Sequence, residues 1–439
     1  MDGGDGSRHN VEAMFSRLLL LPLLAPLFFT GAMAAQFPAS DQIPSQPNLP
    51  DPLVSQSGQK VTTRDQWMLQ RAPELRELFQ HYEYGFLPPA PAKVEAKVER
   101  EDTAAFGGKA TLRELTLSWG MPDVQIHLLL VTPNHREKPA PVFLGLNFNG
   151  NHALVNDPLV RVPDAATYPD HNHGGPEVHR GKQVEMWNIE QSIDRGYAVA
   201  SFFTGDVVPD EVNMAKERLQ RFRRSTEAAP DDCATLGAWA WGLMRAVDYL
   251  VTDPAIDGKR IAVVGHSRNG KTAILAAALD ERIAMAIPLQ AGCGGTAPAR
   301  VAPELSTPQA NGRSIVETVK RINTSFPHWF CDIFKQFNDA PDRLPFDQHE
   351  LIALCAPRPV LVCAATEDQW ANPKGQFEML KAASPVYQLV AGEGLGATEM
   401  PEVGKLLSSR LGYFIREGKH SMSKVDWDAS LDYADRWLK

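Results

Sequence analysis

An apolar run, a short turn and an alanine-rich segment follow one another over residues 260–280, and this stretch constrains the fold most. Residues 261–264 are apolar without polar alternation, which is typical of a strand buried on both faces of a parallel sheet. Residues 272–279, rich in Ala and Leu, predict a helix. The turn between them carries Ser267, so we expect its hydroxyl to project above the carboxyl end of a central strand.

The turn itself, G-H-S-R-N-G over residues 265–270, corresponds to the nucleophile elbow of the α/β-hydrolases. It differs in one respect: the second glycine falls one place late, and Asn269 occupies its usual position. An ordinary strand–helix turn with a capping serine has the same bare G-x-S pattern. The order of the surrounding elements favours the elbow.

Strand and helix patterns alternate along the chain, which predicts an α/β-hydrolase fold: a mostly parallel sheet with helices on both faces, a three-layer αβα sandwich. The strand expected at 141–148 is followed by Asn149, Gly150 and Asn151, where such hydrolases have a second backbone donor for an oxyanion. Further strands are expected at 93–99, 111–119, 124–131, 197–203, 284–289, 359–365 and 386–390, and helices at 63–82, 187–195, 234–251 and 427–438.

The N-terminus has the pattern of a signal peptide over residues 1–34, with Arg8 and Arg17 before an apolar run and Ala-Met-Ala at its end. An uncleaved anchor is the alternative. A flexible leader rich in Pro, Ser and Gln is expected over 35–60, and one catalytic domain over 61–439. We therefore expect a secreted or periplasmic protein without membrane attachment after signal cleavage.

Net charge and cysteine spacing indicate which classes of ligand the protein is not expected to bind. A net charge of −9 without long runs of one sign argues against nucleic acid. The five cysteines show no C-x-x-C or Cys/His zinc spacing, so we expect no metal or cofactor. We expect a monomer.

A serine hydroxyl needs a base within hydrogen-bond reach and an acid that orients the base. In α/β-hydrolases the chain order is serine, acid, histidine. The acid is expected just after the strand at 359–365, where Glu367 and Asp368 are both candidates and the distance from the strand favours Asp368.

The base is expected in the loop before the final helix, where His420 stands. His349 is its competitor, but it precedes the acid-bearing strand and fits a structural histidine at a helix start. His266 adjoins the serine, and neighbouring side chains on a tight turn point apart. His420 is therefore the predicted base.

With these residues located, the chain resembles the glucuronoyl esterases of carbohydrate esterase family 15, of the bacterial type. The resemblance spans roughly residue 67 to the C-terminus. It is carried by these segments: GHSRNGK, DERIAMAIPLQAGCGG, GRSIVETVKRINTSFPHWF, FDQHELIALCAPRP, EDQWANP and GKHSM.

The resemblance implies that Ser267 attacks an ester carbonyl, that His420 takes and returns the proton, and that Arg268 helps to hold the oxyanion. It also implies three residues that bind the glucuronate ring: Lys271, Glu317 and Trp370. Each side chain suits its role, because lysine donates, glutamate accepts from hydroxyls and tryptophan offers a flat face to a pyranose.

Two differences from the family stand out. Many members carry the triad acid as glutamate where this chain has Gln290, so the acid must be Asp368 or Glu367. Fungal members pair cysteines beside the serine and the histidine, whereas this chain has His266 and Ser421 there, so that disulfide is absent.

The expected function is hydrolysis of esters of (4-O-methyl)-D-glucuronic acid, as in lignin–glucuronoxylan linkages, through an acyl-serine intermediate. An acetyl xylan esterase or another carbohydrate esterase is the alternative of the same class. A catalytically inactive carbohydrate-binding protein is the alternative of another class, and the presence of all three types of triad residue argues against it.

Overall fold

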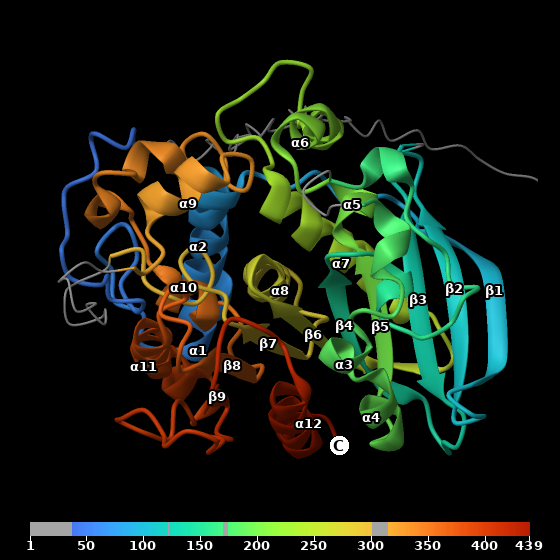
Figure 1. The fold of residues 1–439 in the computed structure, drawn as a ribbon. Coiled ribbons are helices and arrows are strands. Elements are labelled where there is room, and N and C mark those ends of the chain that lie inside the picture. The colour runs from blue at the N-terminus through green and yellow to red at the C-terminus, as the bar shows by residue number, and fades with distance from the viewer. Residues whose placement is uncertain (1–36, 122, 170–173, 301–314) are drawn as a thin grey trace, which may run out of the picture. The chain divides into compact units, whose positions relative to one another are not determined.

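A sheet of nine strands organises the computed structural model, which describes residues 37–121, 123–169, 174–300 and 315–439 (Figure 1). The predicted signal peptide lies outside these residues. The strand order is β1-β2-β3-β5-β4-β6-β7-β8-β9. The strands are β1 (Glu95–Ala105), β2 (Ala110–Ser118), β3 (Ile126–Pro133), β4 (Ala140–Asn147), β5 (Ala198–Phe203), β6 (Ile256–His266), β7 (Met285–Leu289), β8 (Val360–Ala365) and β9 (Leu411–Arg416).

Most of the sheet is parallel. The neighbours from β5 through β4, β6, β7 and β8 to β9 all pair in parallel, whereas β1, β2 and β3 form an antiparallel edge. Parallel strands have their carboxyl ends at one edge, where the loops that follow them meet. Every residue of β4, β5, β7, β8 and β9 is buried, as a sheet covered on both faces requires.

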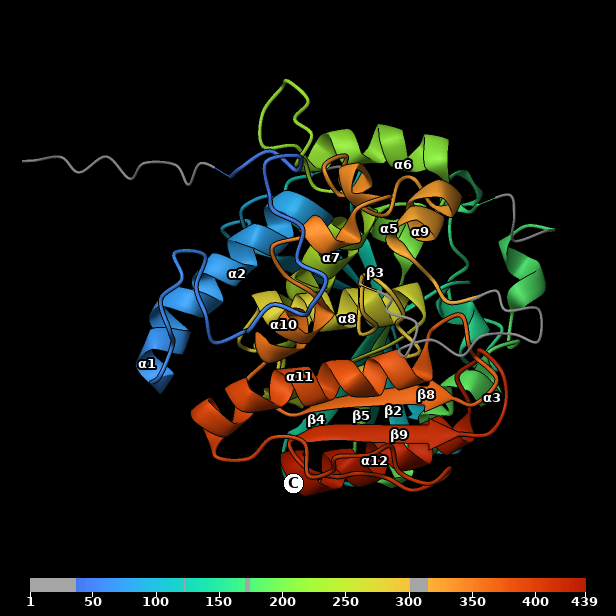
Figure 2. The same cartoon turned by 90° about the vertical axis from the view of Figure 1, so that its left-hand side faces the viewer.

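Helices cover the sheet on both sides, which confirms the predicted three-layer α/β fold. The helices α7, α8 and α11 contact the strands from one side, and α4 and α12 contact strands of the same sheet. Figure 2 shows α11 and α12 on opposite sides of β8 and β9. The helices are α1 (Arg64–Gln66), α2 (Ala72–Phe79), α3 (Val184–Trp187), α4 (Ile189–Asp194), α5 (Thr204–Val207), α6 (Val212–Arg218), α7 (Thr235–Leu250), α8 (Arg268–Leu279), α9 (Val319–Ser325), α10 (Gln348–Ala353), α11 (Pro373–Ala391) and α12 (Lys424–Leu438).

The strand expected at 386–390 is wrong, because these residues lie in α11. A five-residue apolar run fits either a strand or one side of a helix. The buried residues Leu380, Ala383, Tyr387 and Val390 recur at three- and four-residue spacing, which is the helical period. The last strand is instead β9, which the sequence prediction missed.

The flexible leader expected over 35–60 is also wrong for most of its length. The compact unit begins at Ala39. The carbonyl of Gln46 accepts a hydrogen bond from Arg300 Nε at 2.9 Å, and His349 Nε2 lies 2.9 Å from the carbonyl oxygen of Pro50. These contacts hold the segment against the domain, and they give the buried His349 the structural role expected of it.

All five cysteines lie within the described residues, where each is buried and unpaired. Positions 266 and 421 are His and Ser, so no disulfide can form between them. Within the described ranges, no helix combines the length and the apolar composition needed to cross a membrane.

Candidate active site

The strand–serine–helix turn is sharp, because Ser267 alone separates β6 from α8. Its φ of 59° and ψ of −128° lie in a region that L-residues rarely adopt, and such strain is typical of functional sites. The backbone N–H of Ser267 donates to Leu289 O at 2.9 Å, which ties the turn to β7. Gly265 is required here, since a Cβ at this position would lie 2.1 Å from Asn269 O.

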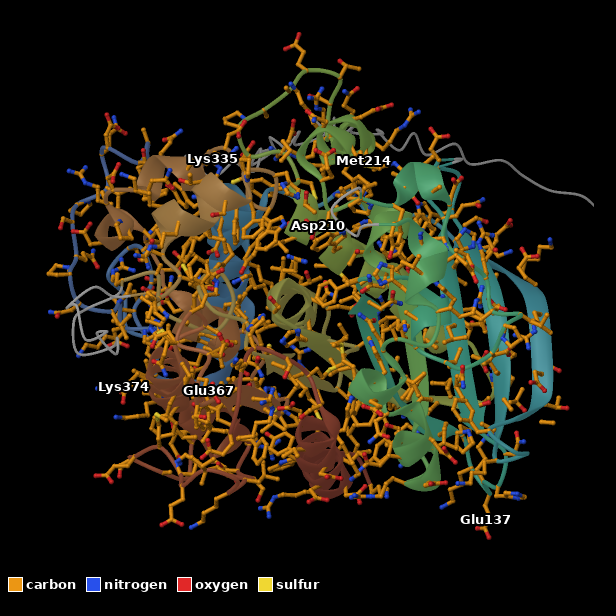
Figure 3. The ribbon with its side chains drawn as sticks, viewed as in Figure 1. Glu137, Asp210, Met214, Lys335, Glu367 and Lys374 are labelled. Carbon is orange, nitrogen blue, oxygen red and sulfur yellow. The ribbon has the colours of Figure 1, made fainter. Side chains whose placement is uncertain are left out.

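A histidine and a carboxylate meet at the same edge of the sheet. Asp368 follows β8 and is 4% exposed, and His420 follows β9. His420 Nδ1 lies 2.7 Å from Asp368 Oδ2. Glu367, labelled in Figure 3, has an exposed side chain, and its backbone N–H donates to Gly418 O. Among the described residues, the carboxylate of this loop that contacts His420 is therefore Asp368 and not Glu367.

The imidazole of His420 lies over the elbow. Its ring centroid is 4.4 Å from that of His266, the residue that precedes Ser267. No hydrogen bond joins the Ser267 hydroxyl to His420 within the described residues. Such bonds are often long in ligand-free enzymes and tighten when substrate binds.

His266 cannot compete as a base. Burial, together with the neighbouring charge of His420, lowers the pKa of His266 to about 3. The ring therefore stays neutral near pH 7. The sequence prediction missed its contact with His420, because the two residues are far apart in the chain and only the fold brings their rings together.

Arg268 is held in a fixed environment at the first turn of α8. Its guanidinium lies 4.9 Å from the ring of Phe148 and 5.3 Å from the ring of Trp329, both within cation–π range. Its Nε forms an ion pair with Asp210 Oδ2 at 2.8 Å. Asp210, labelled in Figure 3, comes from the segment between α5 and α6.

Asp210 also contacts two further side chains through its other carboxylate oxygen. His328 Nε2 lies 2.9 Å from Asp210 Oδ1, and Trp329 Nε1 donates to the same oxygen at 2.8 Å. Burial alone would raise the pKa of Asp210, but His328, the charge of Arg268 and Trp329 together lower it. Asp210 therefore stays ionised beside Arg268. No motif marks Asp210 in the sequence, so only the fold could find it.

The proposed sugar-binding residues form a chain of contacts. Lys271 Nζ donates to Ala291 O at 2.5 Å, to Cys293 O at 2.6 Å and to Glu317 Oε2 at 2.7 Å. An ammonium has three hydrogens, so its donors are already used. The side chain of Lys271 is only 3% exposed and holds Glu317, and its binding to the sugar stays a prediction.

Glu317 and Trp370 complete this chain. Trp370 Nε1 donates to Glu317 Oε1 at 3.1 Å, and the tryptophan remains 37% exposed. Glu317 is buried, which raises its pKa, while Lys271 opposes that rise. Gly292 makes the close approach possible, since a Cβ there would lie 2.3 Å from Glu317 Oε2. A flat aromatic face is thus held rigidly at the surface.

Gly150 lies in the turn after β4 where a second backbone donor is expected, but its own N–H is not free. Its N–H already donates to Asn147 Oδ1 at 2.7 Å. The residue from this loop that reaches the elbow is Phe148, through its contact with Arg268. This contact places the positively charged side chain of Arg268 beside the loop that follows β4.

Comparisons with known proteins agree with this architecture. A family model described as "Glucuronyl esterase, fungi" matches residues 171–391. The chain is 41% identical to carbohydrate esterase MZ0003 from an unknown prokaryotic organism, over 90% of this chain and 91% of that protein. It is 28% identical to a 4-O-methyl-glucuronoyl methylesterase of Hypocrea jecorina, over 82% of this chain and 65% of that protein. The solved glucuronoyl esterase of Solibacter usitatus superposes with a TM-score of 0.81 at 36% identity, covering 91% of this chain and 100% of that one.

Proposed function

Because the chain belongs to the glucuronoyl esterases of carbohydrate esterase family 15, which are carboxylic ester hydrolases, we propose that it cleaves esters of 4-O-methyl-D-glucuronic acid by a serine mechanism. The observation that carries the proposal is the 2.7 Å contact of His420 Nδ1 with Asp368 Oδ2, at the sheet edge where Ser267 leaves β6. These are the three groups that acyl transfer requires.

In the first step, Ser267 Oγ attacks the ester carbonyl while His420 Nε2 takes the hydroxyl proton. Asp368 holds the imidazole in the tautomer that leaves Nε2 free to accept, and it stabilises the imidazolium that forms. The negative charge on the carbonyl oxygen develops beside Arg268. A preorganised oxyanion donor contributes about 3–4 kcal/mol to such a transition state.

In the second step, the ester C–O bond breaks and His420 returns its proton to the leaving alcohol. Water then attacks the glucuronoyl-serine, again losing a proton to His420. The bond between the acyl carbon and Ser267 Oγ breaks, His420 returns the proton to Oγ, and free glucuronate leaves. The chain's own side chains supply every proton transfer in this scheme.

Two groups support recognition of the uronate. The exposed face of Trp370 offers a stacking surface to a pyranose, and Glu317 has oxygen lone pairs left to accept from sugar hydroxyls. We assign Lys271 the supporting role of holding Glu317. The polymer we propose is glucuronoxylan joined to lignin, and the signal-like residues 1–34 favour action in the periplasm or outside the cell.

The substrate class is tested by rates on matched esters. We expect benzyl D-glucuronate to be hydrolysed at least about tenfold faster, by kcat/KM, than benzyl D-galacturonate, because a site that binds a hydroxyl penalises its epimer. Purified mature protein and release of benzyl alcohol give the measurement. Faster turnover of acetylated xylan or p-nitrophenyl acetate would instead favour the acetyl esterase alternative.

The role of Arg268 is tested through its partner. We expect Asp210→Asn to lower kcat by about 10- to 100-fold with little change in KM, because the guanidinium loses the charge that orients it toward the oxyanion. Steady-state kinetics on a glucuronate ester measure this. The control is Asp432→Asn. Asp432 forms an ion pair with Arg195, which lies just before the amino end of β5, whereas the site lies at the carboxyl ends of the strands. Equal kinetics for both variants would contradict the role of Asp210.

A further inference from the structure

Gln290 stands immediately after β7 with its side chain 2% exposed. Its side-chain amide forms two hydrogen bonds with the backbone of Ser421: Nε2 donates to Ser421 O at 2.9 Å, and Oε1 accepts from Ser421 N at 2.9 Å. His266 Nε2 lies 3.3 Å from the same Oε1. Gln290 thus links the elbow strand to residues 417–421, here called the histidine loop.

The backbone of Gln290 is strained to make this link. Its φ is 51°, in the left-handed region that disfavours a glutamine. Its N–H donates to Cys363 O at 2.8 Å, which anchors it to β8. Strain of this kind persists only where the surroundings impose it, and it concentrates at functional sites.

Arg416 completes the support of the histidine loop from the other side. Its guanidinium donates to the carbonyls of Glu417 at 2.8 Å, Lys419 at 3.2 Å and Ser421 at 2.7 Å. Arg416 is in turn paired with the buried Asp426 at 2.8 Å. A guanidinium can only donate, so Arg416 cannot accept from the N–H of Ser421, which donates to Gln290 Oε1 instead.

We infer that Gln290 is a positioning residue for His420, since its amide fixes the peptide next to the histidine and so the place of the imidazole above Ser267. This inference rests on the proposed function. An amide suits the task because it offers one donor and one acceptor, as the facing N–H and C=O of Ser421 require, whereas a carboxylate offers no donor. Asp368 already supplies the negative charge, so position 290 is left to fix geometry.

The test is Gln290→Asn. Asparagine tolerates a positive φ and keeps the amide, but it is one methylene too short to reach Ser421. We expect kcat on a glucuronate ester to fall about 10- to 100-fold, because a small misplacement of a catalytic group has an effect of this size. We expect KM to change by less than about threefold, since the contacts of Glu317 and Trp370 are untouched.

The matched control is Gln80→Asn. Gln80 Nε2 donates to Arg76 O at 3.2 Å and its Oε1 accepts from Leu87 N at 3.2 Å, so the same two bonds to the backbone are lost away from the site. Its kcat should equal that of the parent. If thermal unfolding shows that Gln290→Asn does not fold, Gln290→Met and Gln80→Met give the same comparison.

Equal kcat values for the Gln290 and Gln80 variants would overturn the positioning role, and a fall in kcat for the Gln290 variant alone supports it. The outcome is separable from the proposed function. If the protein turns over acetate esters in place of glucuronate esters, the proposed substrate fails, and the same comparison with p-nitrophenyl acetate still decides the role of Gln290.

Discussion

Ser267→Ala should lower kcat on a glucuronate ester by about 10⁶-fold, the size of the loss when the nucleophile of a serine hydrolase is removed. No covalent intermediate can then form, and His420 has no hydroxyl to deprotonate. The remaining turnover would come from oxyanion stabilisation and binding alone. Initial rates at high enzyme concentration measure the loss.

The stability of this variant should not change, because alanine keeps the Cβ and the strained backbone of Ser267 does not depend on the hydroxyl. A melting temperature equal to that of the parent is the control. The variant should also still bind glucuronate, which isothermal titration can measure. Turnover within about tenfold of the parent would mean that another group performs the attack, and binding without any activity in the parent would favour an inactive carbohydrate-binding protein.

The sequence predicted the parts of the fold that depend on local pattern. The apolar strand before Ser267 and the helix after it follow from continuous hydrophobicity, and they are present as β6 and α8. The strand expected at 386–390 failed because a short apolar run does not distinguish a strand from a buried helical face. Local pattern therefore located the elbow but not every strand of the sheet.

The site was predictable where the order of elements constrains it. Asp368 was predicted from its place just after the strand that is β8, and His420 from its place in the loop before the final helix, and the two side chains meet. Asp210 and Arg416 could not be found in this way, because their roles arise from contacts across the fold. The burial of Lys271 likewise could not be predicted from the sequence, because its three hydrogen-bond acceptors lie far from it in the chain.

Asp368→Asn should lower kcat by about 10⁴-fold, through the tautomer of His420. Asp368 Oδ1 accepts from Ala371 N at 3.3 Å while Oδ2 faces His420 Nδ1. In the asparagine variant the amide oxygen keeps the contact with Ala371, so the amide nitrogen faces the imidazole. Nδ1 must then act as the acceptor, the proton moves to Nε2, and His420 cannot take the hydroxyl proton of Ser267.

Glu367→Gln is the matched control. It removes the same charge from the neighbouring residue, whose side chain is exposed to solvent. Its kcat should stay within about twofold of the parent, because exposed charges contribute little to a neighbouring site. The contrast between the two variants separates loss of the tautomer from loss of charge. A larger effect for Glu367→Gln would mean that the loop after β8 rearranges when substrate binds. Equal small effects for both would mean that the carboxylate acting on His420 comes from outside this loop.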